Sequence, residues 1–168
     1  MSDAPDVLES VLKHWKNSNQ SLARKHIILK GGFTAEAFEQ AIQEFQQMGA
    51  AIDHVVVQRD KASETLILYK ENMRDLMKRI AFLVRGSYPE SAYTRGLPAL
   101  PDSRSNEAKF MAPVDKTYLV WKQINMYQPL VMPEGTTLEA YGKGIQVLRQ
   151  AFKARDKAFL QERQLRAA

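Results

Sequence analysis

Apolar residues recur at a fixed heptad spacing through the first half of the chain, and this spacing predicts helix. Over residues 38–83, two positions repeat every seven residues without a change of phase. The first heptad position holds Phe38, Phe45, Ile52, Arg59, Leu66, Met73 and Ile80. The second holds Ala41, Met48, Val55, Ala62, Tyr69, Leu76 and Leu83. Arg59 alone is not apolar, and a register of this length is typical of coiled-coil-like packing.

The heptad segment predicts either one helix over 35–85 or a helical hairpin that turns near 58–65. Thr34 is a suitable N-cap, and Phe33 and Phe38 occupy the two positions of a hydrophobic staple. The stretch 58–65 is polar, and Ser63 could cap a second helix. However, neither Pro nor Gly occurs between Ala50 and Arg85. Both arrangements fit the pattern.

Three further helices are predicted, over 5–17, 115–126 and 137–163. The first rests on the stripe Val7, Leu8, Val11, Leu12 and Trp15. The second would be capped by Asp115, although the β-branched and aromatic run 117–121 leaves a strand open as an alternative. The third opens on a capping box of Thr136 and Glu139, and its apolar stripe extends to Phe159.

Proline and glycine interrupt the segment 86–113, so we predict that this segment is irregular. It contains Pro89, Pro98, Pro101 and Pro113. The predicted fold class is therefore all-α: a single domain over 1–168, built as an up-and-down helix bundle with coiled-coil-like heptad packing and one long Pro-rich loop.

Composition narrows the possible functions. The chain has 168 residues and no cysteine, which excludes disulfides, thiolate metal sites and a cysteine nucleophile. The acidic start of the chain lacks the layout of a signal peptide, and no apolar run approaches the roughly 20 residues that span a bilayer. We therefore expect a cytoplasmic protein without a transmembrane segment.

The net charge of +5 is concentrated at the C-terminal end. Residues 143–168 contain seven basic and two acidic side chains, whereas 1–142 contain 17 of each. A basic helix could contact nucleic acid or anionic lipid, and the nearest approach to a basic stripe is Lys143, Arg149, Lys153 and Lys157. No aromatic residues suited to base stacking are interleaved with them.

No catalytic or metal-binding pattern stands out. His14, His26 and His54 have no metal-ligand spacing, and Glu71 and Asp75 have basic neighbours at ion-pair spacing. The segment 135–144 only superficially resembles a phosphate loop, since Gly144 replaces the required hydroxyl residue. We expect the glycines there to allow close approach of a neighbouring helix or loop.

Two arginines, Arg59 and Arg155, interrupt apolar stripes. Each could pair with an acid, bind an anion, or extend into water at the end of the bundle. If the protein were an enzyme, the polar groups of the 86–113 segment best placed to form a pocket would be Tyr88, Tyr93 and Arg95.

These observations favour a non-enzymatic helical scaffold or protein-interaction module that self-associates and needs no cofactor. The alternative is a basic-surface binder of nucleic acid or anionic lipid that uses the C-terminal helix. The sequence indicates neither a substrate nor a specific partner.

Overall fold

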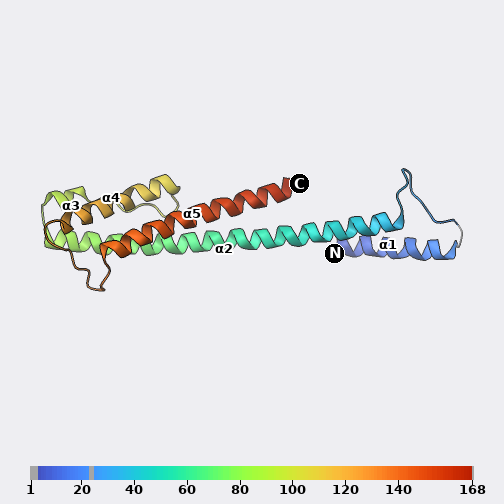
Figure 1. The fold of residues 1–168 in the computed structure, drawn as a ribbon, viewed down its shortest axis with the longest axis horizontal. Coiled ribbons are helices and arrows are strands. Elements are labelled where there is room, and N and C mark those ends of the chain that lie inside the picture. Colours follow the sequence, from blue (N-terminus) through green and yellow to red (C-terminus); the bar gives the residue numbers. More distant parts are fainter. Residues whose placement is uncertain (1–3, 23–24, 168) are drawn as a thin grey trace. The chain divides into compact units, whose positions relative to one another are not determined.

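The fold is all-α in the computed structural model, which describes residues 4–22 and 25–167. The helices are α1 (Ala4–Ser21), α2 (Ala35–Ser87), α3 (Ala92–Gly96), α4 (Glu107–Asn125) and α5 (Leu138–Ala167) (Figure 1). The described residues contain no β-strand, only an isolated bridge between Leu29 and Phe33 in the turn before α2. The predicted fold class is thus confirmed at the level of all-α.

The chain divides into two compact units, which we call unit 1 (Met1–Val56) and unit 2 (Val57–Ala168). The 53-residue helix α2 contributes to both units. A single domain therefore stays a prediction, and each unit is described by itself below.

Helix α2 is continuous through the stretch where a hairpin was one alternative, so the predicted split near 58–65 is wrong. Ser63 does not cap a new helix. Its hydroxyl donates instead to the carbonyl of Arg59, one turn earlier in the same helix (2.9 Å). Without Pro or Gly, no residue in this stretch forces the backbone out of the helical conformation.

In unit 1, α1 packs against the beginning of α2 around Trp15. The Trp15 ring lies 6.5 Å from Phe33 and 5.9 Å from Phe38, between ring centroids. The Thr34 hydroxyl accepts a hydrogen bond from the amide of Ala37, which confirms the predicted N-cap. Helix α1 continues four residues beyond the predicted end, and in this added turn the hydroxyls of Ser18 and Ser21 donate to helix carbonyls one turn earlier.

The core of unit 2 is formed by one stripe of α2 together with α4 and α5 (Figure 1). On α5, Tyr141 stacks on Tyr118 of α4 at 6.3 Å and lies edge-on to Trp121 at 5.9 Å. The Tyr141 hydroxyl donates to the carbonyl of Val114, and burial raises its pKa. The largest fully buried side chains are Trp121, Tyr141, Phe110, Phe152, Ile80, Ile124 and Leu148.

The buried stripe of α2 differs from the predicted pair of heptad positions. From Leu66 onward the first heptad position is buried as expected, but the second position is only half-buried. The residue after the second position is buried instead. The stripe therefore consists of Leu66, Lys70, Met73, Met77, Ile80 and Val84. Lys70 is a charged member of this stripe. A prediction from the spacing of apolar residues alone therefore placed the second row of buried residues one position too early.

The predicted irregular segment 86–113 contains the short helix α3 and the beginning of α4, so that prediction is wrong over 92–96 and from residue 107 onward. Helix α4 begins at Glu107, eight residues before the predicted start, because the Asn106 side chain accepts from the amide of Lys109 and caps it. Pro113 lies inside α4. Its disruptive effect, about 3 kcal/mol, is offset by the burial of Phe110 and Met111 in the preceding turn.

The strand alternative for 117–121 is also wrong, because these residues belong to helix α4 and the buried side chains follow the helical period. Thr117, Val120, Trp121 and Ile124 are buried at spacings of three and four residues. Helix α5 begins at Leu138, where Thr137 rather than Thr136 accepts from an amide, that of Ala140.

The glycines of α5 allow close packing, as predicted. A Cβ atom at Gly142 would lie 3.4 Å from the Tyr118 ring, and one at Gly144 would lie 3.3 Å from the Met73 methyl group. The apolar stripe of α5 ends earlier than predicted, because Phe159 is exposed and the buried positions are Ala158 and Glu162.

We predict that Leu148→Ala lowers the free energy of unfolding by about 2–5 kcal/mol, because Leu148 is fully buried between helices. The matched control is Leu119→Ala on α4, whose side chain is exposed, and it should change stability by no more than about 0.5 kcal/mol. Urea unfolding followed by circular dichroism measures both. Equal losses would contradict the packing described here.

Candidate interaction surfaces and polar anchors

Part of the heptad register lies uncovered within unit 1. There α1 packs on the side of α2 that carries the buried Ala35 and Ile42. The heptad residues Phe45 and Met48 remain 56% and 45% exposed. With the half-buried Ile52 and Val55 they form a row that we call the free seam (Phe45, Met48, Ile52 and Val55).

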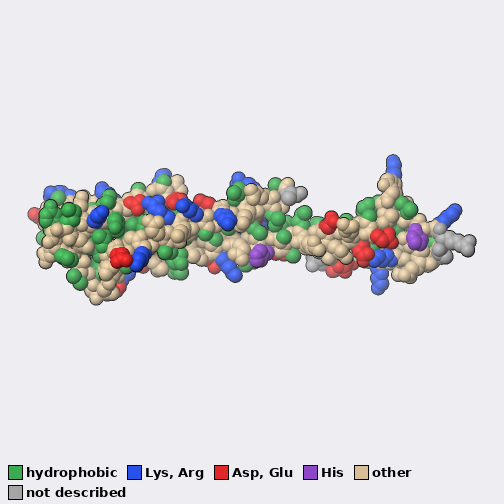
Figure 2. Space-filling view, viewed as in Figure 1, with side chains coloured by type: hydrophobic (Ala, Val, Ile, Leu, Met, Phe, Trp, Pro, Cys, Tyr) green, Lys and Arg blue, Asp and Glu red, His purple; other side chains and the backbone are tan. Residues whose placement is uncertain are grey.

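A second apolar feature is Phe82, near the C-terminal end of α2 in unit 2. Its side chain is 78% exposed, although a large aromatic side chain usually gains from burial. The space-filling view shows hydrophobic side chains gathered at this end of unit 2 (Figure 2). Exposed aromatic residues in such clusters are typical of protein-interaction sites.

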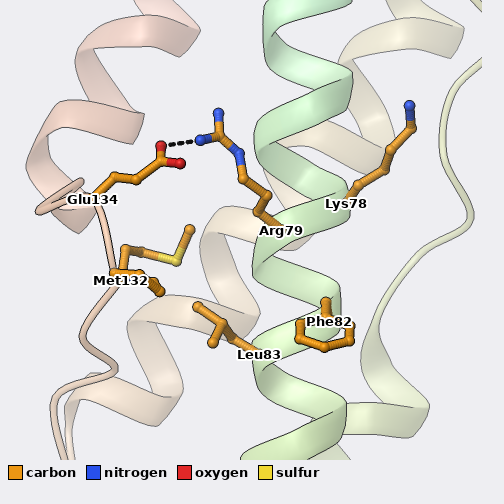
Figure 3. A pocket seen from close by; sticks show the side chains of 7 residues that line it. Lys78, Arg79, Phe82, Leu83, Met132 and Glu134 are labelled. Atoms are coloured by element: carbon orange, nitrogen blue, oxygen red, sulfur yellow. Dashed lines mark hydrogen bonds and ion pairs between the residues drawn. The ribbon is translucent and has the colours of Figure 1, made fainter.

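Phe82 lies between two hollows. The first has a volume of about 430 Å³ and an apolar wall of Leu83, Met132 and Pro133. Figure 3 shows Phe82 and Leu83 on α2, with Met132 and Glu134 on the connection before α5. Arg79 forms an ion pair with Glu134 at the rim of this hollow (Figure 3).

The second hollow, of about 460 Å³, lies between α2 and the connection that follows α3. Its lining includes Ala81 and Phe82 of α2 together with Leu97 and Pro98 of the connection. Lys78 lines both hollows, and Arg85 lines the second. Phe82 therefore forms an apolar ridge with a basic border. The heptad spacing did not predict a role for Phe82, although an aromatic residue two positions beyond Ile80 falls outside both apolar heptad positions.

No family model, curated protein or solved structure matches this chain.

Lys70 is a buried cation that fixes the connection between α3 and α4. Its Nζ donates to the carbonyls of Ser103 (2.9 Å) and Ser105 (2.8 Å). The same atom lies 5.1 Å from the ring centroid of Phe110 and 4.9 Å from that of Phe152. Burial lowers the pKa of Lys70, and the positive charge of Arg155 acts in the same direction. Carbonyl dipoles and aromatic faces thus hold the ammonium group in the core.

Arg59 pairs with a buried acid, which decides among the alternatives for this residue. Its Nη1 lies 2.8 Å from Oε2 of Glu162 on α5, and Arg166 binds the other carboxylate oxygen at 2.8 Å. Burial by itself would raise the pKa of Glu162, but the hydrogen bonds from Arg166 and Arg59 outweigh it and lower the pKa. Arg155, in contrast, pairs with its neighbour Asp156 and lies over the Phe152 ring at 5.7 Å.

The four basic residues singled out on α5 are not equally available. Lys143 pairs with Glu139 (2.8 Å), and Arg149 pairs with Asp115 (2.6 Å). Lys153 and Lys157 are exposed. The face of unit 2 drawn in Figure 2 shows basic and acidic side chains interleaved, without a field of one sign. Nucleic-acid or lipid binding by α5 stays a prediction.

Tyr88, Tyr93 and Arg95 form a local turn structure. The two tyrosine rings meet edge-on at 5.5 Å, and Arg95 donates to the carbonyl of Glu90 at 2.8 Å. The Tyr88 carbonyl accepts from the hydroxyls of Ser91 and Thr94. None of these three residues lines either of the hollows beside Phe82.

Within residues 4–22 and 25–167, no group of three or more His, Asp or Glu side chains is placed to hold a metal ion. The helices described over the same residues include none that is long and apolar enough to cross a membrane.

We predict that Lys70→Met lowers the free energy of unfolding by about 1.5–3 kcal/mol, because two carbonyls lose a charged donor while the side-chain volume is kept. Lys116→Met on α4, where the lysine is exposed, is the matched control and should be nearly neutral. Urea unfolding compares the two. A neutral Lys70→Met variant would show that the buried amine is not a structural anchor.

Glu162→Gln should lower the thermal midpoint at neutral pH, and the difference from the unchanged protein should shrink in acid. Because folding lowers the pKa of Glu162 below its ordinary 4.5, its carboxylate stabilises the fold above that pH. This contribution is lost as the pH falls through the lowered folded-state value.

Calorimetry from about pH 7 to about pH 3 measures this difference. Glu139→Gln makes the same charge change in an exposed pair with Lys143, so it should have little effect at any pH. A Glu162→Gln midpoint that stays below the unchanged protein by the same amount at every pH would contradict the assignment.

Proposed function

We propose that this protein is a non-enzymatic helical scaffold that pairs with a second copy of itself through the free seam of α2. The observation that carries the proposal is the exposure of Phe45 and Met48. Phe45 holds the same heptad position as the buried Leu66 and Met73, and Met48 holds the position of the half-buried Tyr69 and Leu76. In unit 2 the other helices cover these heptad positions fully or in part, whereas in unit 1 Phe45 and Met48 lie uncovered. Uncovered positions of this kind are suited to packing against a partner helix.

The free seam gains from such a partner for two reasons. Apolar side chains that leave water contribute about 25 cal/mol for each Å² buried. In addition, most of the stability of a helix in water comes from tertiary packing of its apolar face rather than from intrinsic propensity. All residues from Gln43 to Ala51 are exposed, so this part of α2 makes few packing contacts within unit 1.

Antiparallel pairing fits the order of residues along the seam. If two copies of α2 cross near Ala50, Met48 faces Ile52 of the second copy and Phe45 faces Val55. These pairs match the layers of first and second heptad positions in an antiparallel coiled coil.

The borders of the seam favour close approach. Gly49 and Ala51 flank it, and a Cβ atom added at Gly49 would meet no atom within 4 Å. Glu44, one residue before Phe45, is a charged residue at this border. We propose that the contact has coiled-coil packing, and that the helices of unit 2 form an up-and-down bundle.

We predict that Met48→Glu weakens self-association at least about tenfold, because pairing would bury an unpaired carboxylate. Met48 is partly exposed in a single chain, so the helical content should not change. The measurement is sedimentation velocity over a range of concentrations, with circular dichroism of the same samples. Gln47→Glu, one residue outside the seam, carries the same new charge and is the control.

The double variant Met48→Glu/Ile52→Lys tests the direction of pairing. In an antiparallel pair each new glutamate faces a new lysine, so association should recover relative to Met48→Glu alone. In a parallel pair like charges would face one another and association would stay weak. The proposed use of the seam would be refuted if the unchanged protein remained monomeric at every concentration. It would also be refuted if Met48→Glu left the dimer affinity unchanged.

A further inference from the structure

The side of α2 opposite the buried stripe of unit 2 is a continuous exposed face. Apart from the neighbours Ile67 and Leu68, its residues recur at spacings of three and four, so they share one side of the helix. We call it the outer face, and it consists of Asp60, Glu64, Ile67, Leu68, Glu71, Asp75, Lys78, Phe82 and Arg85, all of them exposed.

Charges on the outer face are segregated by sign. From Asp60 to Asp75 the ionisable residues of the face are acidic, apart from the exposed Lys61 at its edge, and beyond Asp75 the two ionisable residues are basic. Each half also carries exposed apolar side chains. Ile67 and Leu68, 56% and 53% exposed, belong to the acidic half, and Phe82 belongs to the basic half. The two halves therefore match each other in charge, and both present apolar contacts.

We propose that the outer face binds the outer face of a second copy in antiparallel orientation, as a contact separate from the free seam. When two copies cross between Arg74 and Asp75, Glu71 faces Lys78 of the second copy and Glu64 faces Arg85. The same alignment places Ile67 opposite Phe82. One alignment thus pairs both charges and apolar residues, and the two-fold symmetry repeats each pair.

The hollows beside Phe82 suit this occupant. Ile67 and Leu68 are consecutive residues, so their side chains diverge by about 100° around the helix. In the antiparallel pair they lie on either side of the Phe82 ridge, next to the apolar walls formed by Leu83 and Met132 and by Leu97 and Pro98. Phe82 is the anchor of the contact, and the charges set its direction.

Asp75, at the crossing point, would otherwise face a second Asp75. Its carboxylate already accepts a hydrogen bond from Lys78 of its own chain at 2.9 Å, and this bond lowers its pKa. Lys78 therefore lies between Asp75 of its own chain and Glu71 of the second copy. This arrangement offsets the repulsion at the crossing point.

Two separate two-fold contacts on one helix would allow this protein to assemble beyond a dimer. A protein with a single two-fold contact stops at a dimer, whereas one with two such contacts at different places adds further copies. The outer face would therefore extend the assembly beyond the dimer that the free seam forms. Neither contact requires the other.

The experiment uses the full chain with Met48→Glu, in which the seam is blocked. Sedimentation velocity should still show a concentration-dependent dimer. Adding Phe82→Gln should weaken that dimer at least about tenfold, and raising the salt concentration should also weaken it. Adding Lys78→Glu should weaken it, whereas adding the pair Glu71→Lys/Lys78→Glu should restore it. Lys153→Glu, an exposed charge reversal on α5, is the control and should have no effect.

Each outcome separates the two contacts. A Met48→Glu protein that is monomeric at every concentration, beside a dimeric unchanged protein, overturns the outer-face contact and supports the seam. If Met48→Glu leaves the dimer affinity unchanged and Phe82→Gln abolishes the dimer, the outer-face contact is supported and the free-seam contact is refuted. Failure of Glu71→Lys/Lys78→Glu to restore a dimer weakened by Lys78→Glu overturns the antiparallel outer-face alignment.

Discussion

Burial of one stripe of α2 against α4 and α5 is the interaction on which unit 2 depends. Met73, Met77 and Ile80 supply the apolar surface from α2, and Trp121 and Phe152 fill the space from the other helices. The glycines of α5 bring that helix close enough for the Met73 methyl group to contact it. Unit 2 accordingly has a densely packed core on one side of α2, and an exposed face on the other.

The same helix leaves apolar surface uncovered. With 53 residues, α2 is several times longer than the average helix of about 11–12 residues. In unit 1 the packing side of α2 carries Ile42, so the heptad residues Phe45 and Met48 stay exposed. A helix with uncovered apolar positions is suited to assembly, and this is the physical basis of the scaffold proposal.

Polar residues inside the apolar stripes give the packing its specificity. Lys70 interrupts the α2 stripe, yet its ammonium group finds two carbonyls and two aromatic faces. Glu162 interrupts the α5 stripe and finds Arg59 and Arg166. The Lys70 ammonium and the Glu162 carboxylate each favour one alignment of the surrounding segments, because a different alignment would leave that charge buried without a partner. Lys70 fixes the connection before α4, and Glu162 aligns the end of α5 with α2.

The sequence by itself determined the helical class, the position of α2, its Thr34 cap and the reason for the α5 glycines. These features depend on periodicity, capping and the lack of breaking residues, which are local properties of the chain. Only the tertiary structure decided which heptad positions are buried and that α4 begins before Pro113. It also revealed Phe82 as an exposed ridge. Those outcomes depend on which distant side chains meet, such as Lys70 with the Ser103 carbonyl, and no local pattern records such contacts.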